Sequence, residues 1–189
     1  SGQSNMQWSV QQSTNSADEI ASAKFPEIRL FSVPLIPSGV PAANVNASWQ
    51  VCTPQTVPAF SAVLFFFGRD IHKNLDVPVG LINTSWGGTR IEPWIPPAGF
   101  QSEKDLSKEL TGLEGAKKAY NSNVKNALPQ LKEWLVQAEK AAANGQELGN
   151  PPPFPPHPLN SNGAATGLYN GMVHPLIPFA MKGVLWYQG

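Results

Sequence analysis

Two serines in this sequence stand where a hydroxyl group could be presented as a nucleophile. Ser4 lies in G-Q-S-N-M near the start of the chain, and Ser85 lies in N-T-S-W-G, directly after an apolar run. A serine held in a sharp turn can attack an acyl carbon while a backbone N–H binds the oxyanion that forms. The chemistry that these segments could support is therefore acyl transfer from an ester.

The segment around Ser85 resembles the G-x-S-x-G turn of serine hydrolases, with asparagine in place of the first glycine. Such a turn needs a helix directly after it, because the helix N-terminus supplies part of the oxyanion site. The next residues are G-T-R-I-E-P-W-I-P-P, and Pro93, Pro96 and Pro97 argue against a long helix. Ser85 is therefore the weaker of the two candidates.

The segment around Ser4 is compatible with two roles. Gly2 permits the unusual backbone angles of a sharp turn. Serine and asparagine are natural caps for the first turn of a helix, where unbound N–H groups attract negative charge. From these residues alone, Ser4 is either a helix cap or a nucleophile.

A serine esterase also needs a histidine as general base, and the sequence has three. Asp70 and His72 form a D-x-H, but residues two apart on a helix point to different sides, which favours a solvent-facing helix residue. His157 stands among prolines and is expected in a loop. His174, in N-G-M-V-H-P, begins a predicted helix, where a capping or structural role is favoured over general base. We expect the base to lie outside these residues.

Composition limits the other classes of function. The 189 residues fit one domain, with 41% hydrophobic and 14% charged residues, as in globular proteins. The 13 basic and 13 acidic residues cancel, so nucleic-acid binding has little support. The single cysteine, Cys52, cannot form an internal disulfide. No apolar run reaches the roughly 20 residues that span a bilayer.

Cofactor motifs are missing from the sequence. No group of histidine, cysteine and acidic residues has the spacing of metal ligands. Neither G-x-G-x-x-G nor a P-loop occurs. We therefore expect neither a metal ion nor a nucleotide cofactor.

Hydrophobic periodicity predicts a helix and several strands in the first half of the chain. Residues 28–33 and 47–51 are expected to be strands, and the apolar run 77–83 a parallel strand covered on both faces. Residues 57–75 predict a helix that starts near Pro58. Its buried face is expected to hold Phe60, Val63, Leu64, Phe67, Ile71 and Leu75.

The second half predicts an insertion followed by a return to the core. Residues 103–146 are rich in Ala, Lys, Glu and Leu and predict one or two helices broken near Pro129, and residues 150–158 predict an extended proline-rich loop. We take 101–162 as an insertion within one domain of residues 1–189. A short helix over 176–181 and a strand over 183–187 are expected after it.

Three segments in order resemble the sialate O-acetylesterase family, a carbohydrate acetylesterase branch of the SGNH (GDSL-like) hydrolases. They are S-G-Q-S-N-M-Q-W, V-P-V-G-L-I-N-T-S-W-G-G-T-R-I-E-P-W and L-Y-N-G-M-V-H-P-L-I-P-F-A-M-K-G-V-L-W-Y-Q-G. The resemblance covers roughly residues 1–100 and 164–189. It implies a three-layer α/β/α, flavodoxin-like fold with a mostly parallel sheet, incomplete in this chain.

The resemblance also implies roles for particular residues. Ser4 is the expected nucleophile, and the N–H groups of Ser4 and of Gly87 or Gly88 are expected to bind the oxyanion. In the family, W-Y-Q-G continues into E-S-N or E-A-N, whose Asn completes the oxyanion site, and the base is a His in a later D-x-H. We therefore expect a chain that is partial at both ends, with the Asn and His supplied by a further C-terminal segment or a second chain.

Further polar residues are expected to contact substrate. Loops at the carboxyl ends of parallel strands line the ligand crevice of open α/β sheets, which includes Arg90. Arg90 either pairs with a sugar carboxylate, as in sialic acid, or forms a surface pair with Glu92. Gln3, Asn5, Asn170 and Gln188 suit sugar hydroxyls or the orientation of Ser4. Trp86, Trp94 and Trp186 are core residues or a sugar platform, of which core is favoured.

These observations predict a serine esterase that removes O-acetyl groups from carbohydrates, with sialic acid as the expected sugar. The alternatives are another carbohydrate ester such as acetylxylan, or a non-catalytic sugar-binding or subunit module. Little turnover is expected from this chain alone. The expected location is a secreted, periplasmic or lysosome-like compartment.

Overall fold

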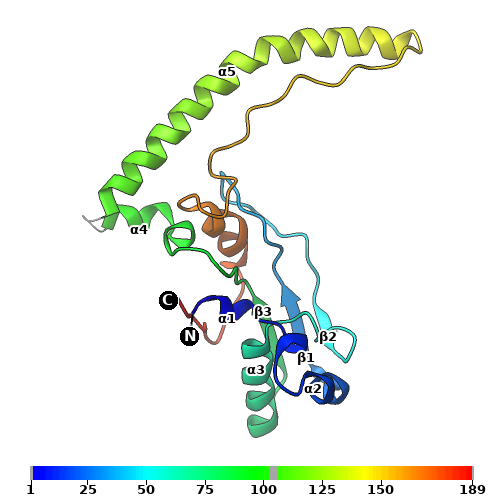
Figure 1. The fold of residues 1–189 in the computed structure, drawn as a ribbon, viewed down its shortest axis with the longest axis vertical. Helices are drawn as coiled ribbons and strands as arrows, with labels where there is room; N and C mark the ends of the chain where they lie inside the picture. The colour runs from blue at the N-terminus through cyan, green and yellow to red at the C-terminus, as the bar shows by residue number, and fades with distance from the viewer. Residues whose placement is uncertain (1, 103–105, 189) are drawn as a thin grey trace.

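The computed structural model describes residues 2–102 and 106–188 (Figure 1). A small sheet and α3 lie at one end of the molecule, and α5 extends away from them. The strands are β1 (Phe25–Ser32), β2 (Gln50–Cys52) and β3 (Val79–Asn83). The helices are α1 (Ser4–Gln7), η1 (Val10–Gln12), α2 (Ser16–Ser22), α3 (Ala62–Leu75), η2 (Glu92–Trp94), α4 (Pro97–Ser102), α5 (Ser107–Ala143), η4 (Tyr169–Val173) and η5 (His174–Leu176).

The sheet has the strand order β2-β1-β3. β1 runs parallel to β3, with Ile28 opposite Val79 and Ser32 opposite Asn83, and antiparallel to β2. The protein is therefore a mixed α/β structure, in which one of the two strand pairs is parallel. The strand expected at 47–51 begins later, at Gln50, because the backbone turns at Ala47, whose N–H donates to the carbonyl of Val45.

A hydrophobic core lies between α3 and the sheet. Phe65 of α3 is fully buried in it, together with Ile28 of β1 and Leu81 of β3. Gly68 allows α3 to approach β3 closely, because a methyl group built there would lie 2.5 Å from Leu81 Cδ2. α3 therefore packs against the sheet through Ala62, Phe65 and Gly68.

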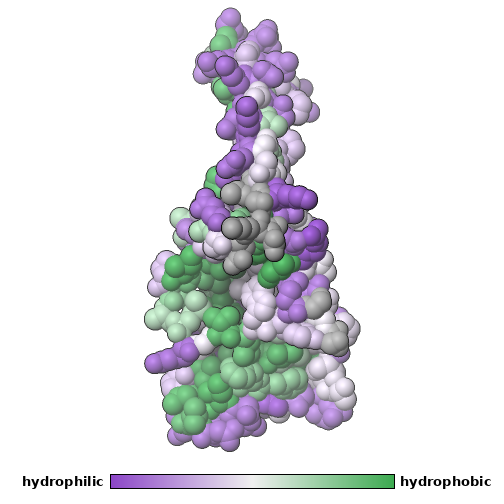
Figure 2. Space-filling model, turned by 90° about the vertical axis from the view of Figure 1, so that its left-hand side faces the viewer, coloured by the Kyte–Doolittle hydropathy of each residue, from purple (hydrophilic) through white to green (hydrophobic). Residues whose placement is uncertain are grey.

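The buried face predicted for this helix was correct only in part, since Phe60 is buried and Leu64 packs against the core. α3 begins at Ala62 rather than near Pro58, and Val63, Phe67 and Leu75 are 41%, 45% and 66% exposed. The helix carries apolar residues on two sides, so the periodicity alone did not identify the side that Gly68 turns toward β3. Figure 2 views the side of the molecule on which α3 lies, and it shows hydrophobic surface gathered over the lower half of the molecule.

β3 is also less buried than predicted. Leu81 is its buried residue, and the other four positions are half-buried or exposed. α3 covers one face, and the other face meets Trp49, whose ring would lie 3.3 Å from a methyl group on Gly80. The predicted parallel strand is therefore confirmed, and both of its faces are covered, although only in part.

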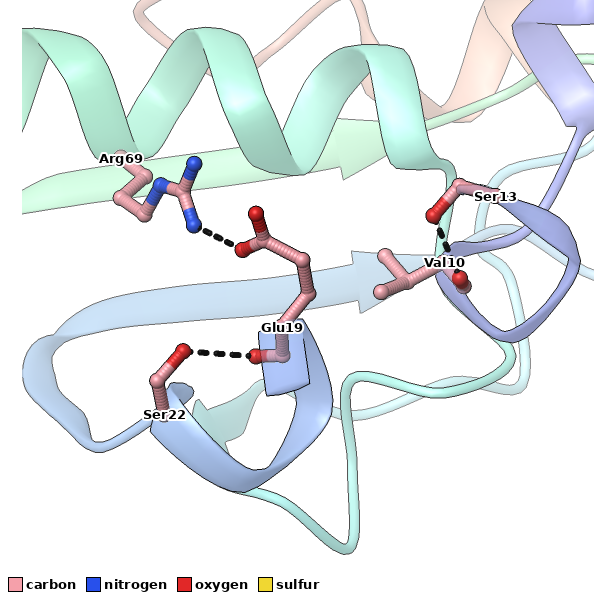
Figure 3. Close-up of polar contacts among 5 residues, drawn as sticks. All are labelled: Val10, Ser13, Glu19, Ser22 and Arg69. Carbon is pink, nitrogen blue, oxygen red and sulfur yellow. Dashed lines mark hydrogen bonds and ion pairs between the residues drawn. The ribbon is translucent and has the colours of Figure 1, made fainter. Parts of the chain in front are cut away.

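A polar contact joins α2 to α3 (Figure 3). Glu19 of α2 forms an ion pair with Arg69 of α3, and both side chains are partly exposed. The Arg69 guanidinium also lies over the ring of Phe65, 5.3 Å from its centroid. A partly exposed ion pair contributes about 1 kcal/mol or less, so this contact adds little to the stability of the fold.

The break expected near Pro129 is not present, because α5 continues through Pro129 from Ser107 to Ala143. Figure 1 shows that this helix bends along its length. Proline removes one helical hydrogen bond and kinks a helix, and here the turns on both sides continue. No helix in the described ranges is long and apolar enough to cross a membrane.

The elements expected at the C-terminal end were wrong. The helix expected over 176–181 is not formed; the wide turn η4 lies before these residues, and the short η5 ends at Leu176. Pro175 and Pro178 lack the N–H donors that a longer helix would need. Residues 183–187 are extended but form no strand in the described structure. Their side chains instead reach the chain start, where Tyr187 Oη accepts a hydrogen bond from the N–H of Gly2 at 2.8 Å.

The reactivity of Cys52 tests the packing of the core between α3 and the sheet. Its side chain is fully buried, and burial raises the pKa of the thiol from 9.0 to about 11, because the thiolate is the charged form. Two pKa units lower the thiolate fraction near pH 8 by about 100-fold, so iodoacetamide should react at least that much more slowly with the folded chain than with the urea-unfolded chain. Mass spectrometry measures both rates.

The same shift has a consequence for stability. Because the folded pKa lies above the unfolded value, the contribution of Cys52 is fully present below about pH 9 and is lost as the pH rises toward 11. Equal alkylation rates in the folded and unfolded chains would show that Cys52 is not buried.

Candidate active site

The turn that carries Ser4 is a single helical turn with a glycine at its entrance. Gly2 has a φ of 128°, a value that favours glycine, and its carbonyl accepts the N–H of Asn5 at 3.0 Å. Ser4 is the first residue of α1, and its side chain is exposed. An N–H at this position has no partner inside the helix, so it is available to a ligand.

The hydroxyl of Ser4 lies beside the W-G-G turn. A methyl group built on Gly87 would lie 3.1 Å from Ser4 Oγ and 3.2 Å from Ser4 Cα. Any larger residue at position 87 would therefore press on the serine. The structure therefore brings Ser4 and Gly87 together.

The two glycines differ in the state of their N–H groups. The N–H of Gly87 donates to Oε1 of Gln7 at 2.7 Å, so it is occupied in this structure. Gly88 is exposed, with a φ of 76°, and its N–H has no partner among the described contacts. Gln7 was not singled out from the sequence, although its position three residues after Ser4 on a helix places both side chains on one face.

Thr89 connects the parts of this region. Its buried hydroxyl donates to the carbonyl of Trp86 at 2.7 Å and accepts the indole N–H of Trp94 at 2.9 Å. Its carbonyl accepts Nε2 of Gln3 at 3.3 Å and Nε2 of Gln188 at 2.9 Å. Two predicted substrate-binding residues, from opposite ends of the chain, therefore meet at Thr89, which sequence reasoning missed.

A shallow hollow of about 340 Å³ opens beside Gln3, the residue that precedes Ser4. We call it the Thr89 hollow, and it is lined by Gln3, Gly88, Thr89, Arg90, Ile91, Glu92 and Gln188. Arg90, which is 79% exposed, forms an ion pair with Oε1 of Glu92, whose Oε2 is buried and has no hydrogen-bond partner among the described residues. Of the two partners considered for Arg90, the structure shows Glu92.

Two other predicted substrate-binding residues lie outside the Thr89 hollow. Asn170 is buried, and its Nδ2 donates to the carbonyl of Ser38 at 3.2 Å. Its own carbonyl accepts the N–H of Ala42 at 2.9 Å, so Asn170 holds the 38–42 loop. Asn5 is exposed and follows Ser4 directly on α1.

Each histidine is engaged away from the Thr89 hollow. Nδ1 of His72 lies 2.8 Å from the carbonyl of Val77, and Nδ1 of His174 lies 2.9 Å from the carbonyl of Ala42. Nδ1 of His157 accepts the N–H of Leu159 at 3.1 Å, and partial burial lowers its pKa, helped by the charge of a nearby lysine. The structural roles predicted for His157 and His174 agree with these contacts.

Ser85 is placed differently from Ser4. Its hydroxyl lies 3.1 Å from the carbonyl of Met6 and 2.7 Å from Oδ1 of Asn83. The helical segments that follow, η2 and α4, are three and six residues long, which confirms that no long helix starts at this serine. The structure therefore gives Ser85 hydrogen-bond acceptors but no helix N-terminus for an oxyanion.

The three tryptophans considered in the sequence pack mainly in the core next to Thr89. Trp94 is buried and Trp86 is partly buried in a second core cluster with Phe31 and Leu168. Trp186 is 57% exposed and packs edge-on against Trp94, with ring centroids 6.2 Å apart. No group of three or more possible metal ligands is present in the residues searched, 2–102 and 106–188.

A solved structure has a similar fold. It is described as a carbohydrate acetylesterase from Xanthomonas citri, and it matches with a TM-score of 0.64 and 29% identity, covering 100% of this chain and 31% of that one. The chain therefore resembles an esterase of carbohydrates in fold. No protein-family model matches it.

The names of the curated relatives specify a narrower class of esterase. The chain is 33% identical to sialate O-acetylesterase of Rattus norvegicus and 28% identical to that of Homo sapiens, in each case along 100% of its length. It is a homologue of the sialate O-acetylesterases, which confirms the resemblance seen in the three motifs. The chain spans about a third of the length of these relatives, 34% and 30%.

Proposed function

We propose that this chain carries the nucleophile and oxyanion donors of a serine esterase that removes O-acetyl groups from carbohydrates, with O-acetylated sialic acid as substrate. The observation that carries the proposal is the position of Ser4 Oγ against Gly87. The names of the rat and human relatives support the substrate, and the Xanthomonas citri structure supports the wider class.

The proposed reaction is a double displacement. Ser4 Oγ attacks the carbonyl carbon of the acetyl group, and its proton passes to a general base. The tetrahedral intermediate then releases the sugar hydroxyl, which takes up that proton, and leaves acetyl-Ser4. Water attacks this ester and releases acetate, and the serine regains its proton.

We assign the oxyanion to the N–H groups of Ser4 and Gly88. The N–H of Gly87 is occupied by Gln7, whereas Gly88 is exposed and lines the Thr89 hollow. Gly87 then contributes by having no side chain, since a methyl group there would meet Ser4. One such donor contributes about 10²–10³-fold to the rate in serine hydrolases.

The general base belongs to residues beyond these 189. His72, His157 and His174 each bind a backbone group elsewhere, and none of the three lines the Thr89 hollow. We propose that a further segment or a second chain supplies the base and an additional oxyanion donor. The assembled domain would then be a three-layer α/β/α SGNH fold, in which 101–162 is an insertion.

The sugar is proposed to lie in the Thr89 hollow. Gln3 and Gln188 present amide groups to hydroxyls, and Asn5 lies beside the nucleophile. Arg90 would bind the carboxylate of sialic acid through the guanidinium edge that Glu92 leaves free. Asn170 is proposed to support the site indirectly through the 38–42 loop. A secreted, periplasmic or lysosome-like location suits an enzyme for such substrates.

One observation favours a second candidate substrate. The Arg90–Glu92 pair cancels the charge of the Thr89 hollow, which suits a neutral sugar such as acetylated xylan. Acetate release by the complete gene product from O-acetyl sialic acid and from acetylxylan separates the two. Faster release from the sialic acid supports the first proposal, and faster release from xylan supports the second.

Labelling with a serine-directed phosphonate tests the enzyme class itself. We expect mass spectrometry to find the adduct on Ser4 in the complete gene product, and little turnover by the 189 residues alone. Sugar binding without any adduct would instead identify a non-catalytic binding module. An adduct on Ser85 would show that the nucleophile is wrongly assigned.

A further inference from the structure

The carbonyl of Met6 is the backbone acceptor of α1 that binds two distant side chains, beside the contact of Gln7 with Gly87. The carbonyls of residues 2 to 5 accept backbone N–H groups within the turn, from Asn5, Met6 and Trp8. The carbonyl of Met6 accepts side-chain hydroxyls instead, one from Ser61 at 2.7 Å and one from Ser85 at 3.1 Å. Both donors are far from α1 in sequence, 55 and 79 residues away.

Ser61 fixes the exit of α1 to the start of α3. It is 1% exposed, and its hydroxyl also accepts the N–H of Leu64 as the N-cap of α3. The adjacent backbone makes the same connection, because the N–H of Ala62 donates to the carbonyl of Trp8 at 2.8 Å. The nucleophile turn is therefore attached to a helix that packs on the sheet.

Ser85 fixes α1 to the W-G-G turn. It stands two residues after the end of β3 and two residues before Gly87. Its hydroxyl also lies 2.7 Å from Oδ1 of Asn83, so one proton is shared between two acceptors. The same short segment thus carries both a contact to α1 and the glycine that faces Ser4 Oγ.

We propose that Ser61 and Ser85 are positioning residues, which hold Ser4 at its working distance from Gly87 and Gly88 through the carbonyl of Met6. We call this arrangement of two hydroxyls on one carbonyl the Met6 clamp. The inference rests on the proposed function, because it gives the clamp a catalytic consequence. It also gives Ser85 a role other than the nucleophile that its N-T-S-W-G motif resembles.

Position matters here because α1 is one turn long and its sequence neighbours cannot hold it. An isolated helical turn is unstable in water, so its orientation depends on tertiary contacts. A displacement of about 1 Å in a reacting group lowers a rate by about 10²-fold. Loss of the clamp should therefore reduce the chemical step and leave substrate affinity nearly unchanged.

The test uses Ser85→Ala, Ser85→Thr and the double variant Ser61→Gly with Ser85→Ala in the complete gene product. Glycine replaces Ser61 because it is nearly as good an N-cap, whereas it has no hydroxyl. We expect the double variant to lower kcat by about 10²-fold with KM within about threefold of the wild type. The kcat of Ser85→Ala alone should lie between those of the wild type and the double variant. The kcat of Ser85→Thr should equal that of the wild type.

Ser13→Ala is the matched control. Its hydroxyl donates to the carbonyl of Val10 at 2.7 Å, a bond of the same kind and length at the end of η1 (Figure 3). We expect kcat and the rate of phosphonate labelling at Ser4 to be unchanged in this variant. A loss of kcat in the clamp variants that Ser85→Thr fails to restore, or an unchanged kcat in the double variant, would overturn the inference.

A second measurement separates the clamp from the proposed function. The ¹³C resonance of the Met6 carbonyl reports its hydrogen bonds directly, so it should shift in Ser85→Ala and return in Ser85→Thr. If the wild type neither releases acetate nor reacts with the phosphonate, the proposed function fails, and this resonance then decides on the clamp. An unchanged resonance in Ser85→Ala overturns it.

Discussion

Replacing Ser4 by alanine should abolish acetate release while the protein stays folded. In the proposed reaction the hydroxyl forms the acetyl intermediate, and removing a serine nucleophile typically lowers kcat by about 10⁴-fold or more. The side chain is exposed and makes no hydrogen bond among the described contacts, so Tm should change by less than about 1 °C. Acetate release by the complete gene product and a thermal melt measure the two effects.

Ser22→Ala provides the comparison for Ser4→Ala. Ser22 is an exposed serine of α2 whose hydroxyl donates to the carbonyl of Glu19 at 3.1 Å, far from the Thr89 hollow (Figure 3). Activity should be unchanged in this variant. Retention of full activity by Ser4→Ala would refute the assignment of the nucleophile and, with it, the proposed function.

Replacing Phe65 by alanine should have the largest effect on stability. The ring is fully buried between α3 and the sheet, 6.3 Å from the ring of Phe25, and Arg69 lies over it. Truncating a buried phenylalanine lowers the free energy of unfolding by about 3–5 kcal/mol, through lost burial and the cavity that remains. Urea denaturation followed by circular dichroism measures the change.

The same helix offers the control for Phe65→Ala. Phe67 is two residues away and 45% exposed, so Phe67→Ala should lower the free energy of unfolding by less than about 1 kcal/mol. Similar losses for both variants would show that the packing face of α3 is assigned wrongly. The large loss at Phe65 would also weaken the attachment of Ser61, because this residue begins the same helix.

Local patterns predicted the elements that depend mainly on their own residues. The alternation near residues 28–33 predicted β1, and the apolar run before N-T-S-W-G predicted β3. The face of α3 could not be predicted, because Phe65, Phe66 and Phe67 are consecutive and the choice depends on Gly68 against Leu81. The strand expected over 183–187 would have to pair with an edge of the described sheet, and these residues pair with neither β2 nor β3.

The candidate site, too, was predicted only in part from local sequence. The motifs singled out Ser4, Gly87 and Gly88, and the structure brings Ser4 and Gly87 together. Thr89 and Gln7 were missed, because their roles come from hydrogen bonds to residues about 80 to 100 positions away. Nothing in the local sequence marks such a contact.

The long arm formed by α5 has an evolutionary consequence. Among the described side chains of α5, Leu113 is the buried one, and farther along Tyr120 meets His157 and Trp134 donates to the carbonyl of Gly149. The distal half of α5 therefore packs on the non-helical segment that follows it in the chain. Whole helical turns could be gained or lost there without moving Ser4, so we expect related genes to differ in length in this arm.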